Sequence, residues 1–167
     1  HYEGLGEGHS SPALANGMIY LSGMTEGMGY VYALAPDGKL KWKTPYGEEF
    51  TESYPGARST PVIAGDLLYI YSGHGLLTCM DAHNGEIKWR KSAFEDFDGE
   101  NIRWGVTETV LIDGDKVFLT PGGKKHNMVA LNRFNGDLIW STPAKKNLSA
   151  YCTPLLIELP ERKLLVT

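Results

Sequence analysis

Five side chains have the chemistry needed to bind a ligand: His9, Arg58, Trp104, Glu108 and Tyr151. Arg58 and Glu108 are the sharpest candidates, because a charge at a buried position is costly unless it is paired or used. They could serve a ligand or simply pair with each other. Trp104 offers an aromatic face on which a flat ring could stack, and Trp104 and Tyr151 together could stack a sugar ring. We predict that the five residues line the rim of a binding pocket; the alternative is a wetted channel with a structural role alone.

Candidates for a metal ligand or a nucleophile are weaker. His74 and His83 fall in Gly-containing turns and do not have the spacing of metal ligands. Cys79 and Cys152 are too few for a disulfide framework, and we expect Cys79 to be an inert core thiol because related segments carry alanine there. We find no nucleophile with a neighbouring base. The sequence therefore gives no catalytic residue and no metal ligand.

An internal repeat with a period close to 49 residues places the ligand-binding candidates. Three segments align without a gap, and each unit later carries a tryptophan at a shared position. The aligned segments are 11–20, 60–69 and 109–118, and the tryptophans are Trp42, Trp89 and Trp140. The residue pairs that open the units are His9-Ser10, Arg58-Ser59, Thr107-Glu108 and, after a shorter connection, Tyr151-Cys152.

Each unit reads as four short antiparallel strands. Apolar runs of about five to seven residues alternate with turns containing Asn-Gly, Asp-Gly or Gly-Asp, which supply the positive φ of tight hairpins. In the second unit we expect strands near 59–64, 67–72, 76–81 and 86–91. A four-stranded unit this small cannot bury its own faces, which is typical of a β-propeller blade. We predict an all-β chain forming one partial propeller, with blades at 9–44, 58–92 and 105–142 and the start of a fourth at 150–167.

The segment from Ala130 to Trp140 has the pattern Ala-Leu, four residues, Gly, three residues, Trp. This pattern resembles the tryptophan-docking motif of the quinoprotein β-propellers, the PQQ-like repeat family, and the chain is closest to a secreted bacterial branch of uncertain function. The resemblance implies that Trp42, Trp89 and Trp140 dock each blade onto its neighbour. It also implies a periplasmic or secreted location. About three and a half blades cannot close a ring, so we expect either the remaining blades of a longer chain or a second copy to complete it.

Charge and hydropathy exclude two classes of partner. Sixteen Lys and Arg residues against 20 Asp and Glu give a net charge of -4, so the chain has no basic excess for binding nucleic acid. No stretch approaches the roughly 18 to 20 apolar residues of a membrane-spanning helix. A protein partner remains compatible with the sequence.

We consider three functions, of which the resemblance implies the first two and the aromatic residues alone suggest the third. The first is a non-catalytic binding or scaffolding module, as in a family member that helps to assemble outer-membrane barrels. The second is part of an alcohol or polymer dehydrogenase, in which the full protein would hold pyrroloquinoline quinone and calcium near Arg58, Trp104 and Glu108. The adjacent cysteine pair common in such dehydrogenases is missing here, so we favour the scaffold and expect no cofactor in this segment. The third is a carbohydrate-binding propeller that stacks sugars on Trp104 and Tyr151.

Overall fold

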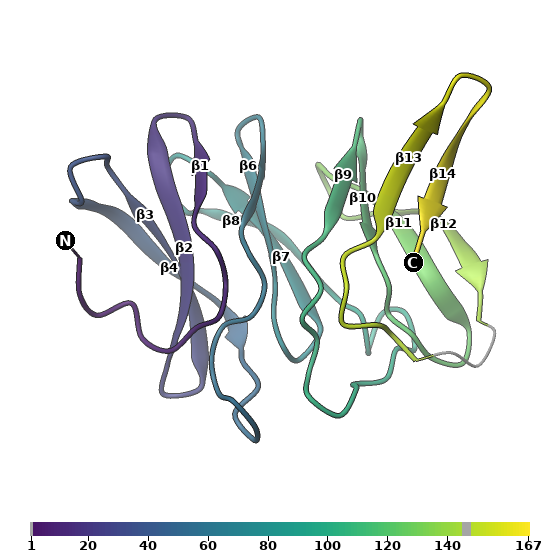
Figure 1. The fold of residues 1–167 in the computed structure, drawn as a ribbon, viewed down its shortest axis with the longest axis horizontal. Helices are drawn as coiled ribbons and strands as arrows, with labels where there is room; N and C mark the ends of the chain where they lie inside the picture. Colours follow the sequence, from purple (N-terminus) through teal and green to yellow (C-terminus); the bar gives the residue numbers. More distant parts are fainter. Residues whose placement is uncertain (1, 145–147) are drawn as a thin grey trace.

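The fold consists of β-sheets in which each strand pairs with the strand next to it in the sequence. The computed structural model describes residues 2–144 and 148–167, and within them three four-stranded antiparallel sheets and one two-stranded sheet stand side by side from one end of the molecule to the other (Figure 1). The predicted all-β partial propeller is confirmed. The described residues contain no helix with the length and apolarity needed to cross a membrane. The strands are β1 (Ala13–Ala15), β2 (Met18–Thr25), β3 (Met28–Leu34), β4 (Leu40–Glu48), β5 (Val62–Ala64), β6 (Leu67–Tyr71), β7 (Leu76–Asp81), β8 (Ile87–Ser92), β9 (Leu111–Asp113), β10 (Lys116–Leu119), β11 (His126–Asn132), β12 (Leu138–Pro143), β13 (Leu155–Leu159) and β14 (Arg162–Val166).

The apolar core lies between the sheets. On β6, Leu68 and Ile70 pack toward the first sheet, whereas Tyr69 and Tyr71 pack toward the third. This alternation buries both faces of the second sheet, because successive side chains of a strand point to opposite sides. Cys79 is fully buried in the second of these cores and forms no disulfide, so its expected place in the core is confirmed.

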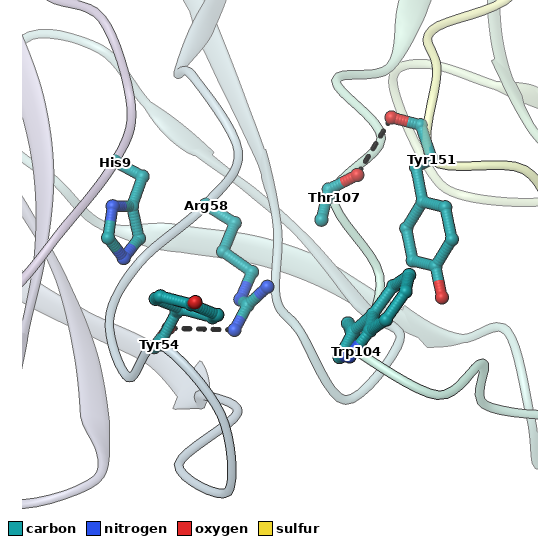
Figure 2. Close-up of a pocket in the computed structure, with 6 residues that line it drawn as sticks. All are labelled: His9, Tyr54, Arg58, Trp104, Thr107 and Tyr151. Carbon is teal, nitrogen blue, oxygen red and sulfur yellow. Dashed lines mark hydrogen bonds between the residues drawn. The ribbon is translucent and has the colours of Figure 1, made fainter.

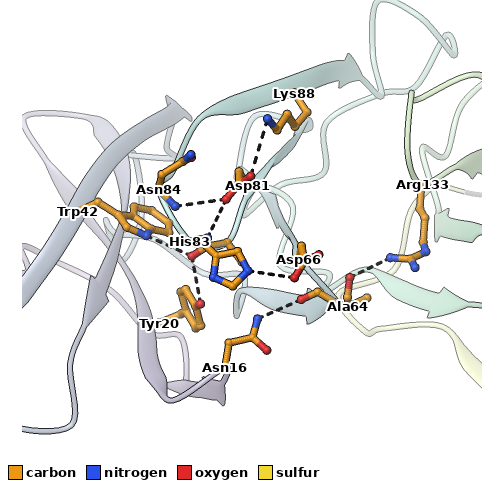
Figure 3. Close-up of polar contacts among 12 residues, drawn as sticks. Asn16, Tyr20, Trp42, Ala64, Asp66, Asp81, His83, Asn84, Lys88 and Arg133 are labelled. Atoms are coloured by element: carbon orange, nitrogen blue, oxygen red, sulfur yellow. Dashed lines mark hydrogen bonds and ion pairs between the residues drawn. The ribbon is translucent and has the colours of Figure 1, made fainter.

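One backbone carbonyl on the second sheet accepts two hydrogen bonds from the first. Trp42 Nε1 and Tyr20 Oη both donate to the carbonyl oxygen of Ala82, at 3.2 and 3.1 Å (Figure 3). The Trp42 ring lies so close to the turn at Gly85 that a Cβ on that residue would come within 2.6 Å of the ring. Gly85 also has a φ of +74°, so the turn needs glycine for two reasons.

The same arrangement recurs one sheet further along. Trp89 Nε1 and Tyr69 Oη donate to the carbonyl oxygen of Arg133, at 3.1 and 2.9 Å, and the Trp89 ring packs against Gly136. Trp140 holds the third such position, but its indole N–H has no acceptor within residues 2–144 and 148–167. The tryptophans at the first two positions therefore join one sheet to the next.

Hydroxyl groups join the sheets at their inner edge. The N–H of Ser11 donates to Thr60 Oγ1 at 3.1 Å, the N–H of Thr60 to Thr109 Oγ1 at 3.2 Å, and the N–H of Thr109 to Thr153 Oγ1 at 3.2 Å. Residues 59–61, which we expected to open a strand, lie outside β5. The Thr60 N–H is bonded to the next sheet and Pro61 has no N–H, so neither can donate to β6.

Replacing Trp89 by alanine should lower the free energy of unfolding by about 3 kcal/mol, since it opens a cavity between two sheets and leaves the Arg133 carbonyl with one donor fewer. Trp140→Ala is the matched control, and we expect it to cost less than half as much. Urea unfolding followed by circular dichroism measures both. Equal losses for the two variants would show that docking onto the next sheet contributes nothing.

Candidate functional site

Four of the five predicted rim residues meet at one pocket of about 670 Å³ (Figure 2). It opens on the face where the first strands of the sheets begin. The pocket is open to solvent, since Tyr54 is 80% exposed and Trp104 44%. Glu108 does not line it. The lining residues are His9, Tyr54, Arg58, Trp104, Thr107 and Tyr151.

The first wall is the loop that precedes the second sheet. Arg58 donates from Nη2 to the carbonyl oxygens of Ser53, at 2.6 Å, and Tyr54, at 2.8 Å. Its guanidinium carbon also lies 5.1 Å from the centre of the Phe50 ring, within range of a cation–π contact. Tyr54 has a φ of +47°, an unusual conformation for a bulky residue. Arg58 thus holds a loop that displays Tyr54 at the pocket.

His9 reaches the same wall from the N-terminal segment. Its backbone N–H donates to the carbonyl oxygen of Ala57 at 2.7 Å, and its Nε2 lies 3.2 Å from the carbonyl oxygen of Pro55. With the proton on Nε2, the ring donates to that carbonyl. The imidazole is therefore fixed against the loop that carries Arg58.

The second wall joins the third sheet to the start of the fourth. The Trp104 and Tyr151 rings are tilted by 39° with their centres 5.5 Å apart, and Thr107 Oγ1 donates to the carbonyl oxygen of Tyr151 at 2.8 Å. Gly105 follows Trp104 with a φ of +73°, and a Cβ there would come within 2.8 Å of the Phe50 ring. Phe50 therefore supports both walls.

The pocket is positively charged although the chain is not. None of the six lining residues is acidic, and Arg58 contributes a guanidinium. Arg103 adds a second cation beside it, with its guanidinium carbon 5.2 Å from the centre of the Trp104 ring. The field of these two cations favours an anionic group in a pocket whose walls are largely aromatic.

Glu108 lies behind the second wall, completely shielded from solvent. Its carboxylate accepts hydrogen bonds from the N–H of Thr120, at 3.1 Å, and from the Thr120 hydroxyl. Burial raises the pKa of Glu108 from 4.5 to about 7. No ion pair joins Glu108 to Arg58 in the described part of the chain. Burial raises the pKa of Glu49 to about 7, and the positive charge of Arg58 is one of the interactions that oppose this rise.

Sequence reasoning missed Tyr54 and Phe50. Both lie in the connection between two repeat units, where the alignment of units gives no information. Glu108 aligns with Ser59 of the second unit, and the structure buries both residues. Within residues 2–144 and 148–167, no three His, Cys, Asp or Glu side chains come together in a way that could hold a metal ion.

Comparison with known proteins agrees with the repeat seen in the sequence. The family model described as "Outer membrane protein assembly factor BamB" matches residues 27–156, most of the chain. A curated relative of that name from Kangiella koreensis is 28% identical over 136 residues, which cover 79% of this chain and 31% of the relative. The chain thus spans about a third of the length of that relative.

Solved structures share the fold. BamB from Moraxella catarrhalis superposes with a TM-score of 0.51 at 19% identity, over 76% of this chain and 33% of that one. A europium-containing methanol dehydrogenase gives a TM-score of 0.59 at 15% identity, over 81% of this chain and 24% of that one. At these identities the likeness concerns the fold alone. The family match confirms the resemblance to PQQ-like propellers, and the chain belongs to the PQQ-like repeat family described as outer membrane protein assembly factor BamB.

Proposed function

We propose that this chain is part of a non-catalytic binding scaffold that takes part in the assembly of outer membrane proteins on the periplasmic side of the membrane. The observation that carries the proposal is the separation of Glu108 from the pocket. The pocket is open, aromatic and cationic, whereas the carboxyl group best suited to acid–base chemistry is sealed behind its wall. Membership of the family described as outer membrane protein assembly factor BamB supports a role in the assembly of outer membrane proteins.

Catalysis would need an acid or base within hydrogen-bond reach of the substrate. Glu108 has no exposed surface, and its oxygens are bonded to Thr120. The His9 ring contacts a backbone carbonyl, and Nη2 of Arg58 contacts two. These contacts fix the walls of the pocket in place. Such an arrangement suits binding to a rigid surface.

The residues of this pocket do not fit pyrroloquinoline quinone. That cofactor is a planar ring with three carboxylates, and among the lining residues only Arg58 carries a permanent positive charge. Trp104, the ring proposed to stack on the quinone, already packs against Tyr151 and lies beneath Arg103. Carbohydrate binding would use the same aromatic faces and polar groups, but the family match points to assembly of outer membrane proteins. We therefore prefer a binding scaffold to either alternative.

Depletion of the full protein in the cells that make it should lower the amount of folded β-barrel protein in the outer membrane. Folded barrels are measured by their heat-modifiable mobility on gels, with a soluble periplasmic enzyme as the control for secretion. We expect the barrels to fall severalfold while the control enzyme stays constant. Unchanged barrels, or an equal fall in both, would contradict the proposed role.

Glu108→Gln tests the burial of the carboxyl group. Because the folded-state pKa of Glu108 is raised from 4.5 to about 7, the contribution of this residue to stability is greatest below pH 4.5 and is lost as the pH rises through 7. Between pH 4.5 and pH 8 the variant should gain about 3 kcal/mol relative to wild type. Glu49 titrates in the same range in both proteins, so its effect cancels. Chemical unfolding at several pH values measures the difference.

The exposed Glu95→Gln serves as the control for the change in net charge, and it should leave the pH dependence unaltered. A difference between Glu108→Gln and wild type that stays constant from pH 4.5 to pH 8 would mean that Glu108 ionises freely. In that case Glu108 would be accessible enough to act on a ligand, and the argument against catalysis would fail.

A further inference from the structure

The scaffold role does not say which surface binds a polypeptide or what kind of segment it takes. Tyr54 gives the first indication. The residue is 80% exposed, and its backbone lies in the left-handed region at a φ of +47°. Strained conformations of bulky residues persist only where the surroundings hold them, and they cluster at binding sites. Here the two hydrogen bonds from Arg58 hold this loop.

The two walls face each other across a slot (Figure 2). Tyr54 and Arg58 stand on one side, and Trp104 and Tyr151 stand on the other. Phe50 supports both walls from below, through its contacts with Arg58 and Gly105. The slot therefore has aromatic side chains on both sides, and one buried ring contacts residues of both walls, a geometry in which a flat side chain can be held between two surfaces.

The charge of the slot indicates that the ligand carries a negatively charged group. The hydrogen bonds of Arg58 to the described residues come from Nη2, which leaves Nη1 available to a ligand. Arg103 stands beside Trp104 on the opposite wall. An anionic group entering the slot would meet the Arg58 guanidinium and no carboxylate among the lining residues, while Arg103 adds positive charge next to Trp104 without lining the slot. Arginine is well suited to bind a carboxylate.

We propose that this slot binds an extended polypeptide segment in which an aromatic side chain lies close to a carboxylate. The proposal rests on the proposed function, because it names the kind of segment that the scaffold holds. Aromatic walls bind the ring, Arg58 binds the carboxylate, and Thr107 and His9 lie at the edge for contacts with the peptide backbone. Exposed aromatic residues and arginine are the side chains that contribute most to protein interfaces.

The test uses an unlabelled peptide of sequence GSEFEYSG, amidated at its C-terminus, and measures its binding to the purified protein by isothermal titration calorimetry. Two matched amidated peptides remove one feature each: GSEAEASG lacks the aromatic rings, and GSQFQYSG lacks the carboxylates. We expect each to bind about tenfold more weakly or worse. We expect the same loss with Tyr54→Ala, whose exposed side chain can be removed without disturbing the core, and with Arg58→Gln.

The control variants are Phe134→Ala and Arg162→Gln, an exposed aromatic residue and an exposed cation outside the slot. Both should bind the peptide as wild type does, and thermal melting checks that every variant is folded. If Tyr54→Ala binds GSEFEYSG normally, or if either matched peptide binds as tightly, the proposal is wrong.

The outcomes also separate this proposal from the proposed function. If no peptide binds while depletion still lowers the folded barrels, the slot assignment fails and the scaffold role stands. If pyrroloquinoline quinone with calcium binds saturably, and Trp104→Ala abolishes that binding, both proposals fail. If an acidic oligosaccharide displaces the peptide and binds more tightly, the slot is a carbohydrate site and the proposal is again wrong.

Discussion

Two backbone carbonyls hold this arc of sheets together. The carbonyl oxygens of Ala82 and Arg133 each accept one hydrogen bond from a tyrosine and one from a tryptophan of the preceding sheet. The tryptophan ring then covers the glycine turn next to the carbonyl, where a side chain would not fit. Between the first three sheets this docking sets how closely neighbouring sheets approach.

Docking at one edge leaves the opposite edge to be fixed by smaller groups. The chain of hydroxyl contacts from Ser11 to Thr153 does this, with one N–H and one hydroxyl at each step. Because these contacts adjoin the residues that open each unit, they also set the spacing of the pocket walls. The slot is thus a product of packing between sheets, and no single blade contains it.

Holding the slot in this form has a structural cost. Tyr54 is strained and exposed, and Glu108 and Glu49 are carboxyl groups kept in places that disfavour their charge. Proteins retain such features where function requires them and stabilise them through the rest of the fold. In this chain the two buried cores between the sheets provide that stability.

Much of the fold could be predicted because it repeats. The strands expected near 67–72, 76–81 and 86–91 match β6, β7 and β8 to within one residue at each end, because hairpin turns and apolar runs are local signals. The slot was predicted only in part. Thr107 and Glu108 are neighbours, and the sequence alone does not tell which of them faces the pocket. Tyr54 and Phe50 lie outside the repeat, and their roles depend on contacts between distant segments.

Hydrogen–deuterium exchange of the protein with and without the GSEFEYSG peptide tests the central claim most directly, which is that both walls of one slot bind the same segment. Slower exchange on both sides of the slot, in segments 50–58 and 101–109, is the predicted result. Protection confined to one of these segments, or found instead in the hairpin of β13 and β14, would contradict the account.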